Sequence, residues 1–406
     1  MTELHLPSEF INAQPVLQKI QEAGFDAYFV GGCVRDVLLH QPIHDVDIAT
    51  SAYPSEIKEL FSRTIDIGIE HGTVLVLWHE EQYEVTTFRT ESTYQDFRRP
   101  DQVTFVRSLA EDLKRRDFTM NALALAENGT IIDLFNGLSD IKQKIVRAVG
   151  DANERFHEDA LRMMRGLRFI SQLDFTMAPD TLAAIEKHSQ LLSFISIERI
   201  RIEWEKLVLG RARNRALRLF LATNCFLYCP QFEQQIEGLQ KFIELPEKQL
   251  TEVEAAWTLL MDCLDVPERQ FVTFFKEWKL SNDTIKQIQE TYQGLQFRKH
   301  FPWNRWMVYT LGTEVVLRVE TLLAYYNLEQ SFVAIEELVQ RLPIESLKDL
   351  QVNGHDLQHT FQKKPGKWLS DTLHFLEKQV VEGAVANQKV ELLQAAENYL
   401  AGICEK

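Results

Sequence analysis

Two aspartates separated by one residue are the first side chains in this chain that could carry out chemistry. Asp45 and Asp47 flank Val46. In a β-strand, residues i and i+2 face the same side, so both carboxylates would project together while Val46 enters the core. Two hard oxygen ligands side by side suit Mg²⁺, and Glu84 is a third acid that could complete the site. Taken alone, the pair is better explained as two solvated acids, and an exposed strand position explains Glu84 nearly as well.

A glycine pair precedes these acids. Gly31 and Gly32 end the strand-like run 25–30 and lead into a helical pattern over 34–39. Glycines let backbone N–H groups approach an anion, a helix N-terminus favours negative charge, and Arg35 could grip phosphate. A Gly-Gly turn alone more often reflects turn geometry. When the glycine turn and Arg35 occur next to a carboxylate pair, a functional explanation of both features becomes the better one. Together they indicate a site that binds a metal ion and the phosphates of a nucleotide.

Two further segments are rich in arginine. Residues 111–122 place Arg116 and Asp117 in a dense basic cluster that suits triphosphate and ribose, although a charge run is usually a solvated face. Residues 154–169 read as one amphipathic helix with an apolar stripe. Its charged side recurs every third residue, at Asp159, Arg162, Arg165 and Arg168. A surface helix with i,i+3 ion pairs is one explanation, and a nucleotide bound by arginines and one aspartate is the other.

The elements that must position these residues change character along the chain. Strand-like runs occur at 25–30, 73–78, 83–88, 103–106 and 130–134, and the second and third read as a hairpin. Helical periods begin near Asn153 and continue with short breaks at Pro230, Pro302 and Pro365. The sequence therefore predicts an α+β fold: a head with a small mixed or antiparallel sheet and helices, then an all-helical remainder.

Composition bounds the class of protein. The chain has 406 residues, 45 % of them apolar and 25 % charged, which excludes disordered, collagen-like and disulfide-scaffold proteins. The net charge of −15 argues against a nucleic-acid partner at first sight. Charge is uneven, however: residues 98–116 hold six basic and three acidic side chains, and residues 199–218 hold seven and two. The head and the first helices are therefore locally basic.

The cysteines and the N-terminus indicate a compartment. Cys225 and Cys229 form the one local pair among five cysteines, and no second pair or His cluster completes a zinc site. Buried free thiols in a reducing environment explain them best. The first residues lack a basic region and an apolar core, and no apolar run reaches the length of a membrane span. We expect a cytoplasmic protein with no membrane partner.

Taken in order, these motifs resemble those of the bacterial class II tRNA nucleotidyltransferases, the CCA-adding enzymes of the polymerase-beta superfamily. The resemblance is carried by Gly31-Gly32-x-Val-Arg35-Asp36, Asp45-x-Asp47, Glu84-Val-Thr-Thr, Arg115-Arg116-Asp117-Phe118-Thr119-Met-Asn121-Ala and Glu158-Asp159-x-x-Arg162. It is dense to about Lys206, where Glu198-Arg199-Ile200-x-x-Glu203 resembles a further motif. Beyond that point only the length and the helical remainder agree.

The resemblance implies addition and repair of the 3′-terminal CCA of tRNA from CTP and ATP, without a nucleic-acid template. It implies four parts: a catalytic head (1–150), a neck that recognises the base (151–218), a body (219–300) and a tail that binds tRNA (301–406). Asp45 and Asp47 would hold Mg²⁺, with Glu84 as a third catalytic acid. Nucleotide contacts would come from Gly32, Arg35, Arg116, Asp117, Asp159, Arg162, Arg165 and Arg168. A homodimer is possible, and the sequence leaves the oligomeric state open.

The proposed protein template has a physical basis. Cytosine and adenine both present an exocyclic amine beside an unprotonated ring nitrogen, so a carboxylate can accept from one while a guanidinium donates to the other. Uracil and guanine invert both contacts, at a cost of about 1–3 kcal/mol for each unpaired polar group. Asp159 with Arg162 would therefore admit C and A. The switch from C to A needs a movable loop, and the polar segment 89–107 fits that role and favours complete C-C-A addition.

Two rival functions remain. A bacterial poly(A) polymerase shares the head motifs, although residues 66–74 look typical of CCA addition. A catalytically silent RNA-binding module would not need Asp45 and Asp47. Residues 298–306 and 363–368 interleave basic and aromatic side chains and could contact RNA, but core tryptophans explain the first segment better and an exposed basic loop explains the second almost as well.

Overall fold

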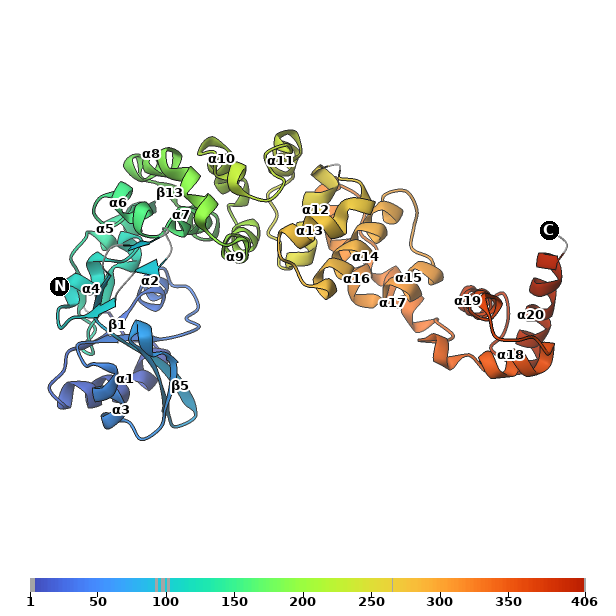
Figure 1. Cartoon of the computed structure of the whole chain (residues 1–406), viewed down its shortest axis with the longest axis horizontal. Helices are drawn as coiled ribbons and strands as arrows, with labels where there is room; N and C mark the ends of the chain where they lie inside the picture. Colours follow the sequence, from blue (N-terminus) through green and yellow to red (C-terminus); the bar gives the residue numbers. More distant parts are fainter. Residues whose placement is uncertain (1–3, 92–93, 96–98, 101–102, 265, 405–406) are drawn as a thin grey trace. The chain divides into compact units, whose positions relative to one another are not determined.

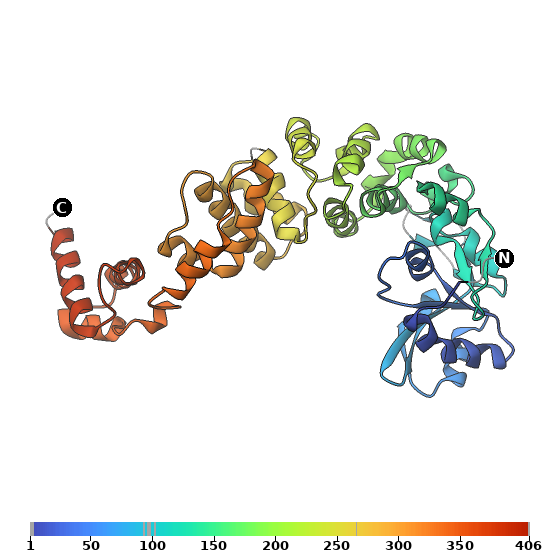
Figure 2. The same ribbon diagram turned by 180° about the vertical axis from the view of Figure 1, so that it is seen from behind.

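The protein is described by a computed structural model, which covers residues 4–91, 94, 95, 99, 100, 103–264 and 266–404. The chain divides into two units, one of residues 1–251 with 276–279 and one of residues 252–275 with 280–406. Figures 1 and 2 follow the chain from the sheet of the first unit, through its helices, to the C-terminal helix α20. The α+β head and the helical remainder predicted from the sequence are confirmed.

One mixed sheet of seven strands forms the head. Its strands are β1 (Ala27–Val30), β2 (Asp47–Thr50), β3 (Thr64–Gly68), β4 (Thr73–Trp78), β5 (Glu81–Thr87), β10 (Leu123–Leu125) and β11 (Ile131–Asp133), in the order β11-β10-β1-β2-β5-β4-β3. Within this sheet β2 and β5 pair in parallel, and the other pairs are antiparallel. The parallel pair aligns Ile48 with Val85, so the acids that precede these two residues come from adjacent strands.

Three short strand pairs lie outside this sheet. They are β6 (Arg89–Glu91) with β9 (Val103–Phe105), β7 (Tyr94–Gln95) with β8 (Arg99–Pro100), and β12 (Ile145–Val146) with β13 (Thr176–Met177). The first two belong to the segment 89–107 that we expect to be a movable loop. Arg98 and Asp101, two residues of that segment, lie outside the described residues.

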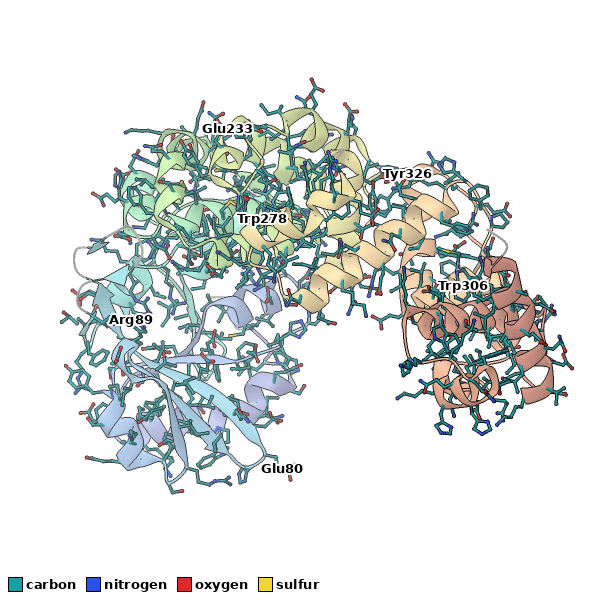
Figure 3. All side chains as sticks on the ribbon, turned by 45° about the vertical axis from the view of Figure 1, so that its right-hand side comes forward. Glu80, Arg89, Glu233, Trp278, Trp306 and Tyr326 are labelled. Atoms are coloured by element: carbon teal, nitrogen blue, oxygen red, sulfur yellow. The ribbon has the colours of Figure 1, made fainter. Side chains whose placement is uncertain are left out.

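The predicted hairpin over residues 73–88 is confirmed. β4 and β5 pair from Thr73 opposite Thr86 to Trp78 opposite Glu81, around a two-residue turn at His79 and Glu80 (Glu80 is labelled in Figure 3). Strand β3 was not predicted, because at the sheet edge it exposes both Ile65 and Ile67 and so lacks a buried apolar face.

The head helices pack on this sheet and close its core. They are α1 (Ser8–Glu22), α2 (Gly32–Leu38), α3 (Pro54–Leu60), α4 (Leu109–Lys114) and α5 (Gly137–Gln143), with the 3₁₀ turns η1 (Ile69–His71) and η2 (Thr119–Asn121). One cluster of buried residues joins three strands to α4, namely Val30, Ala49, Phe88, Leu113 and Ala124. This core fixes the end of β1 and the start of β2 relative to α4, and Gly31 and Asp47 lie at these two positions.

The other long elements of the first unit are all helices. They are α6 (Ala152–Glu158), α7 (Leu161–Leu173), α8 (Pro179–His188), α9 (Ile197–Val208), α10 (Arg213–Ala222) and α11 (Ile236–Glu244), with η3 (Ser189–Phe194) and η4 (Cys225–Tyr228). An aromatic cluster of Trp204, Phe220, Phe232 and Trp278 packs between them, with ring centroids 4.9–6.3 Å apart (Trp278 is labelled in Figure 3).

The single helix predicted over residues 154–169 is wrong. The chain leaves the helix at Asp159, where φ is −138° and ψ is 103°, and re-enters it as α7. The Asp159 side chain accepts a hydrogen bond from the backbone N–H of Leu161 at 3.0 Å and so helps to start α7. The apolar stripe keeps its phase across the two-residue break, and periodicity alone therefore cannot detect it.

The second unit consists of helices in its described residues. They are α12 (Val253–Leu264), α14 (Asn282–Arg298), α15 (Arg305–Leu311), α16 (Thr313–Leu322), α17 (Phe332–Gln340), α18 (Gly354–Phe361), α19 (Lys367–Glu382) and α20 (Lys389–Cys404), with the turns η5 (Glu268–Gln270), η6 (Leu323–Tyr326) and η7 (Leu347–Asp349). The remaining helix, α13 (Phe271–Glu277), begins in this unit and ends in the first. Among the described residues, no helix has the length and hydropathy needed to span a membrane.

Two expectations about side chains outside the head are confirmed. Trp303 is buried and its indole N–H donates to the fully buried Glu320 at 2.7 Å, with Arg298 as the ion partner of that carboxylate, so the Trp303 side chain belongs to the core. Cys225 and Cys229 are buried free thiols, and burial raises the pKa of Cys225 to about 12.

Candidate active site

An open cleft of about 880 Å³ lies where the head sheet meets helices α7 and α9. It is lined by nine basic and four acidic side chains, an excess of five cations in a chain of net charge −15. The cations are Arg35, Arg89, Arg115, Arg116, Arg162, Arg165, Arg168, Arg199 and Lys206. All the site residues predicted from the sequence line this cleft except Asp45.

The glycine turn brings the backbone close to this charge. Gly31 has φ of 79°, in the left-handed region that favours glycine, and it ends β1 directly before α2. A Cβ on Gly31 would come within 3.3 Å of Nη1 of Arg116 and 3.5 Å of Oδ2 of Asp47. The second glycine, Gly32, lies 3.6 Å from Nη2 of Arg35 by the same measure. The turn therefore leaves room beside an arginine and a carboxylate that any larger residue would fill.

The two aspartates are placed differently from the prediction. Strand β2 begins at Asp47, so Asp45 precedes the strand, is exposed, and does not line the cleft; Val46 is only half-buried. Asp47 is turned into the cleft. Burial, together with the charges of Glu84 and Asp45, raises the pKa of Asp47 to about 6, although the charge of Arg116 acts to lower it. The expectation that both acids lie in one strand with Val46 in the core is therefore wrong, although the two carboxylates still influence each other.

These acids form a donor set that fits a divalent cation. Asp47 and Glu84 both line the cleft, on the parallel neighbours β2 and β5, and both are hard oxygen ligands. Burial is the main cause of the raised pKa of Asp47, and the neighbouring carboxylate of Glu84 adds to it. In the described part of the chain, no group of three or more His, Cys, Asp or Glu side chains is already arranged as a metal centre.

Asp117 orients other residues of the cleft. Its Oδ2 accepts from Nε and Nη2 of Arg165 at 2.8 and 2.7 Å, and its Oδ1 accepts from Nδ2 of Asn121 at 3.0 Å. Burial would raise the pKa of Asp117, but the charge of Arg165 and the Asn121 hydrogen bond outweigh it and hold the pKa well below its usual range. Asn121 in turn accepts from Nη1 of Arg35 at 2.8 Å.

Asn121 was not among the predicted site residues. Its position four residues after Asp117, at the end of the Arg-Arg-Asp motif, is the signal that could have found it. Asn121 joins Arg35, after the glycine turn, to Asp117, which in turn holds Arg165 of the neck, so one amide connects segments that lie far apart in the sequence.

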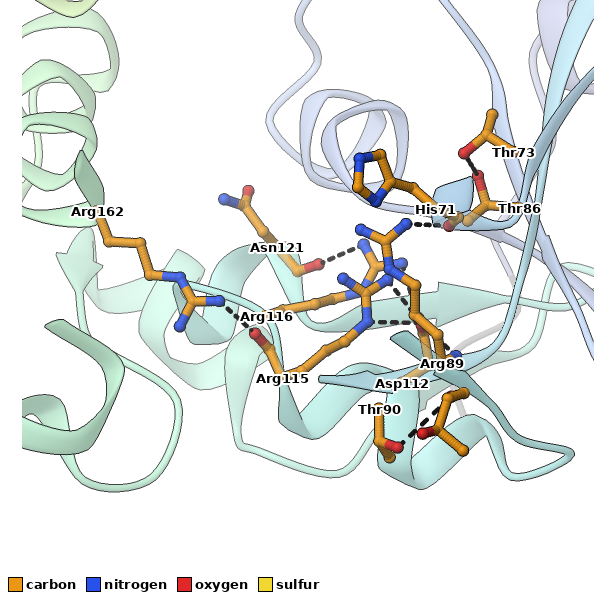
Figure 4. A network of polar contacts seen from close by, with 11 residues as sticks. His71, Thr73, Thr86, Arg89, Thr90, Asp112, Arg115, Arg116, Asn121 and Arg162 are labelled. Atoms are coloured by element: carbon orange, nitrogen blue, oxygen red, sulfur yellow. Dashed lines mark hydrogen bonds and ion pairs between the residues drawn. The ribbon is translucent and has the colours of Figure 1, made fainter. Parts of the chain in front are cut away.

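The two template residues have separate partners. Arg162 is 8 % exposed, and its Nη2 donates to the backbone oxygen of Arg115 at 2.8 Å (Figure 4). Its Nη1 donates to Glu158 at 2.5 Å. Asp159 accepts from Nη2 of Arg199 on α9 at 2.9 Å. Arg199 lines the cleft and was missed as a site residue, because its partner lies 40 positions earlier in the chain.

Phe169 is surrounded by guanidinium groups. The Cζ atoms of Arg168, Arg35 and Arg165 lie 4.4, 5.1 and 5.7 Å from the centre of its ring. Arg168 also pairs with Glu203 of α9 at 3.0 Å, and burial lowers the pKa of Arg168 to about 10. Cation–π contacts of this kind hold arginines apart from one another while their remaining N–H groups stay available to an anion.

Three family models match the chain. Residues 27–147 match the poly A polymerase head domain, residues 174–236 a probable RNA- and SrmB-binding site of polymerase A, and residues 248–396 the tRNA nucleotidyltransferase domain 2. The CCA-adding enzyme of Enterococcus faecalis is 54 % identical over 391 residues, which covers 96 % of both chains. The chain belongs to the CCA-adding enzyme family.

Other CCA-adding enzymes agree over the same length. The enzyme of Ligilactobacillus salivarius is 48 % identical and covers 98 % of both chains. Among solved structures, the Bacillus stearothermophilus CCA-adding enzyme in complex with CTP is 40 % identical, with a TM-score of 0.90 over 98 % of this chain and 100 % of that one. The Thermotoga maritima CCA-adding enzyme complexed with tRNA is 19 % identical with a TM-score of 0.62, a likeness of fold alone.

Proposed function

We propose that this chain adds and repairs the 3′-terminal CCA of tRNA by transferring nucleotides from CTP and ATP with release of pyrophosphate. The observation that carries the proposal is that the carboxylates of β2 and β5 and the arginines of α7 line one cleft, although they lie about 80 to 120 residues apart. A nucleotidyl transfer needs both groups together: oxygens that bind a metal and cations that bind a triphosphate. The full-length relatives support the same assignment.

The head would hold the reacting groups. Asp47 and Glu84, with Asp45 at the entrance to β2, would bind Mg²⁺, which would activate the 3′-hydroxyl of tRNA and neutralise charge on the triphosphate. Gly32 leaves the triphosphate room beside the turn, and Arg35 and Arg116 would bind its oxygens. Because these residues are anchored by hydrogen bonds before the nucleotide arrives, they orient the α-phosphate for in-line attack at little entropic cost.

The neck would choose the base. Asp159 would accept from the exocyclic amine of C or A, and Arg162 would donate to the adjacent ring nitrogen. Asp117 would act through Arg165, and Arg168 would support the same wall by its contact with Phe169. Arg199 directs the Asp159 carboxylate through their ion pair, which makes Arg199 part of the same recognition unit.

The rest of the assignment concerns partners and surroundings. We propose the four-part division into head, neck, body and tail stated above, with tRNA bound along the helical parts, and a cytoplasmic location in keeping with buried free thiols. We keep a homodimer within the proposal. Sedimentation of the purified chain at concentrations from micromolar to nanomolar measures its oligomeric state.

Single-nucleotide reactions separate this function from that of a poly(A) polymerase. With a tRNA that lacks CCA, CTP alone should extend the tRNA by two residues, and ATP alone should give almost no extension. With a tRNA that ends in CC, ATP alone should add one residue. Long products from ATP alone would support the poly(A) polymerase, and no product in any reaction would support a binding module.

A further inference from the structure

A buried carboxylate outside the cleft organises several of the arginines within it. Asp112, in the first turn of α4, is 1 % exposed and does not line the cleft. Its Oδ1 accepts from Nε and Nη2 of Arg115 at 3.0 and 2.7 Å, and its Oδ2 accepts from Nη2 of Arg116 at 3.1 Å (Figure 4). Both arginines do line the cleft. We propose that Asp112 is a positioning residue that aims Arg115 and Arg116 at the triphosphate, an inference that rests on the proposed function.

Charge explains why such a residue is needed. Arg115 and Arg116 are neighbours in sequence, and two guanidinium groups that must point into one cleft repel each other. One carboxylate between them cancels that repulsion and uses up the N–H groups on the inner side of each guanidinium. Burial would raise the pKa of Asp112, but the two arginines outweigh it and lower the pKa, so Asp112 stays ionised.

The remaining contacts of Arg116 direct it toward a ligand. Its Nη1 donates to the backbone oxygen of Asn121 at 3.3 Å, and its Nε is buried without a hydrogen-bond partner in the described structure. A buried N–H group left unpaired costs free energy that a ligand oxygen would recover. Asp112 therefore holds in place the Arg116 guanidinium group, in which the Nε–H group is still unpaired in the described structure.

The same carboxylate reaches two other parts of the site. Its Oδ1 lies 3.4 Å from the backbone nitrogen of Arg89, the first residue of β6, and the Arg89 side chain donates to the backbone oxygen of His71. The backbone oxygen of Arg115 accepts from Arg162 of α7 at 2.8 Å. Through these contacts Asp112 connects Arg89, at the start of the segment 89–107, to Arg115 and Arg116. The backbone of Arg115 connects them in turn to Arg162 of α7.

The test measures nucleotide use by the full-length protein acting on tRNA that lacks CCA. Asp112→Asn keeps the shape of the side chain but removes its charge, so it should raise KM for CTP and for ATP by about tenfold or more, with a smaller change in kcat. Asp140→Asn is the matched control. Asp140 is a buried carboxylate of the same head that pairs with Arg147 and Thr119 away from the cleft, so this variant should keep the KM of the parent.

A double-mutant comparison shows whether Asp112 acts through the arginines. Asp112→Asn should change KM less than twofold when added to a protein that already carries Arg115→Met and Arg116→Met, because no arginine is then left to position. This triple variant has no unpaired guanidinium at Asp112, so it keeps the proposal testable if Asp112→Asn alone does not fold. A parental KM in folded Asp112→Asn, or a full additional tenfold loss in the triple variant, would overturn the proposal. A parent protein that fails to extend the tRNA would instead overturn the proposed function.

Discussion

The Asp159–Arg199 pair offers the sharpest test of how the base is chosen. Asp159→Asn replaces one acceptor oxygen by an N–H₂ donor, which can no longer accept from the amine of cytosine and can pair with the carbonyl of uracil. The two carboxylate oxygens are fixed by the N–H of Leu161 and by Nη2 of Arg199, so the side chain cannot simply turn away. We expect the selectivity for CTP over UTP to fall.

The magnitude follows from the contacts. One mispaired polar contact in a partly buried site costs about 1–3 kcal/mol, so Asp159→Asn should reduce the CTP/UTP ratio of kcat/KM about 5- to 150-fold. Arg199→Met removes an ion pair whose side chains are 30 % and 19 % exposed. It leaves the carboxylate in place but less well directed, and we expect a loss of about 1 kcal/mol, or about fivefold.

The assay is single-turnover incorporation of CTP and UTP into tRNA that lacks CCA. Arg201→Met is the matched control: Arg201 lies on the same helix, α9, and pairs with Glu205 at 3.0 Å, but it does not line the cleft. Circular dichroism confirms that each variant is folded. Parental selectivity in folded Asp159→Asn would refute the protein-template reasoning, and an equal loss in Arg201→Met and Arg199→Met would refute the specific role of Arg199.

Three further predictions concern metal, pH and the second unit. Asp47→Asn should abolish incorporation of both CTP and ATP, while the thermal unfolding midpoint stays within about 5 °C of the parent's. In the parent protein, EDTA should abolish the activity and added Mg²⁺ should restore it. The pKa of Asp117 lies well below its ordinary value of about 3.9, so its stabilising effect is complete above that pH, begins to be lost as the pH falls below it, and is gone only below the pKa of the folded state; urea unfolding of Asp117→Asn should show lower stability at pH 7 and a weaker loss between pH 5 and 3 than the parent. Glu320→Gln leaves the half-buried Arg298 beside a neutral partner and should cost about 3 kcal/mol in urea unfolding of the second unit, with the KM for CTP unchanged; a parental unfolding curve would contradict the stabilising role of the ion pair between Arg298 and the buried Glu320.

Local patterns predicted the elements that lie close together in the sequence. The hairpin of β4 and β5 has a continuous apolar run before a short turn and alternating apolar residues after it, and a helix starts directly after Gly31 as the glycine pair suggests. The ordered motifs also identified ten residues of the cleft. In each of these cases the information lies within a few residues of the feature itself.

The failures concern contacts between distant segments. Asp45 was placed in a strand because alternation alone sets no strand boundary, whereas the start of β2 is set by its pairing of Asp47 with Val30. The break at Asp159 interrupts a helix whose apolar stripe continues unchanged. Arg199 was missed because a charged residue in a helix has the same local pattern whether it faces solvent or a carboxylate 40 residues away.

The central claim is tested most directly by the length and sequence of the product that the purified chain makes. The protein should be incubated with Mg²⁺, CTP, ATP and a tRNA that lacks its last three nucleotides, and the product sequenced at its 3′ end. We predict extension by C, C and A, followed by a stop that persists with excess nucleotide and time. A tail of many adenosines, or no extension while the protein is folded and binds the tRNA, would contradict it.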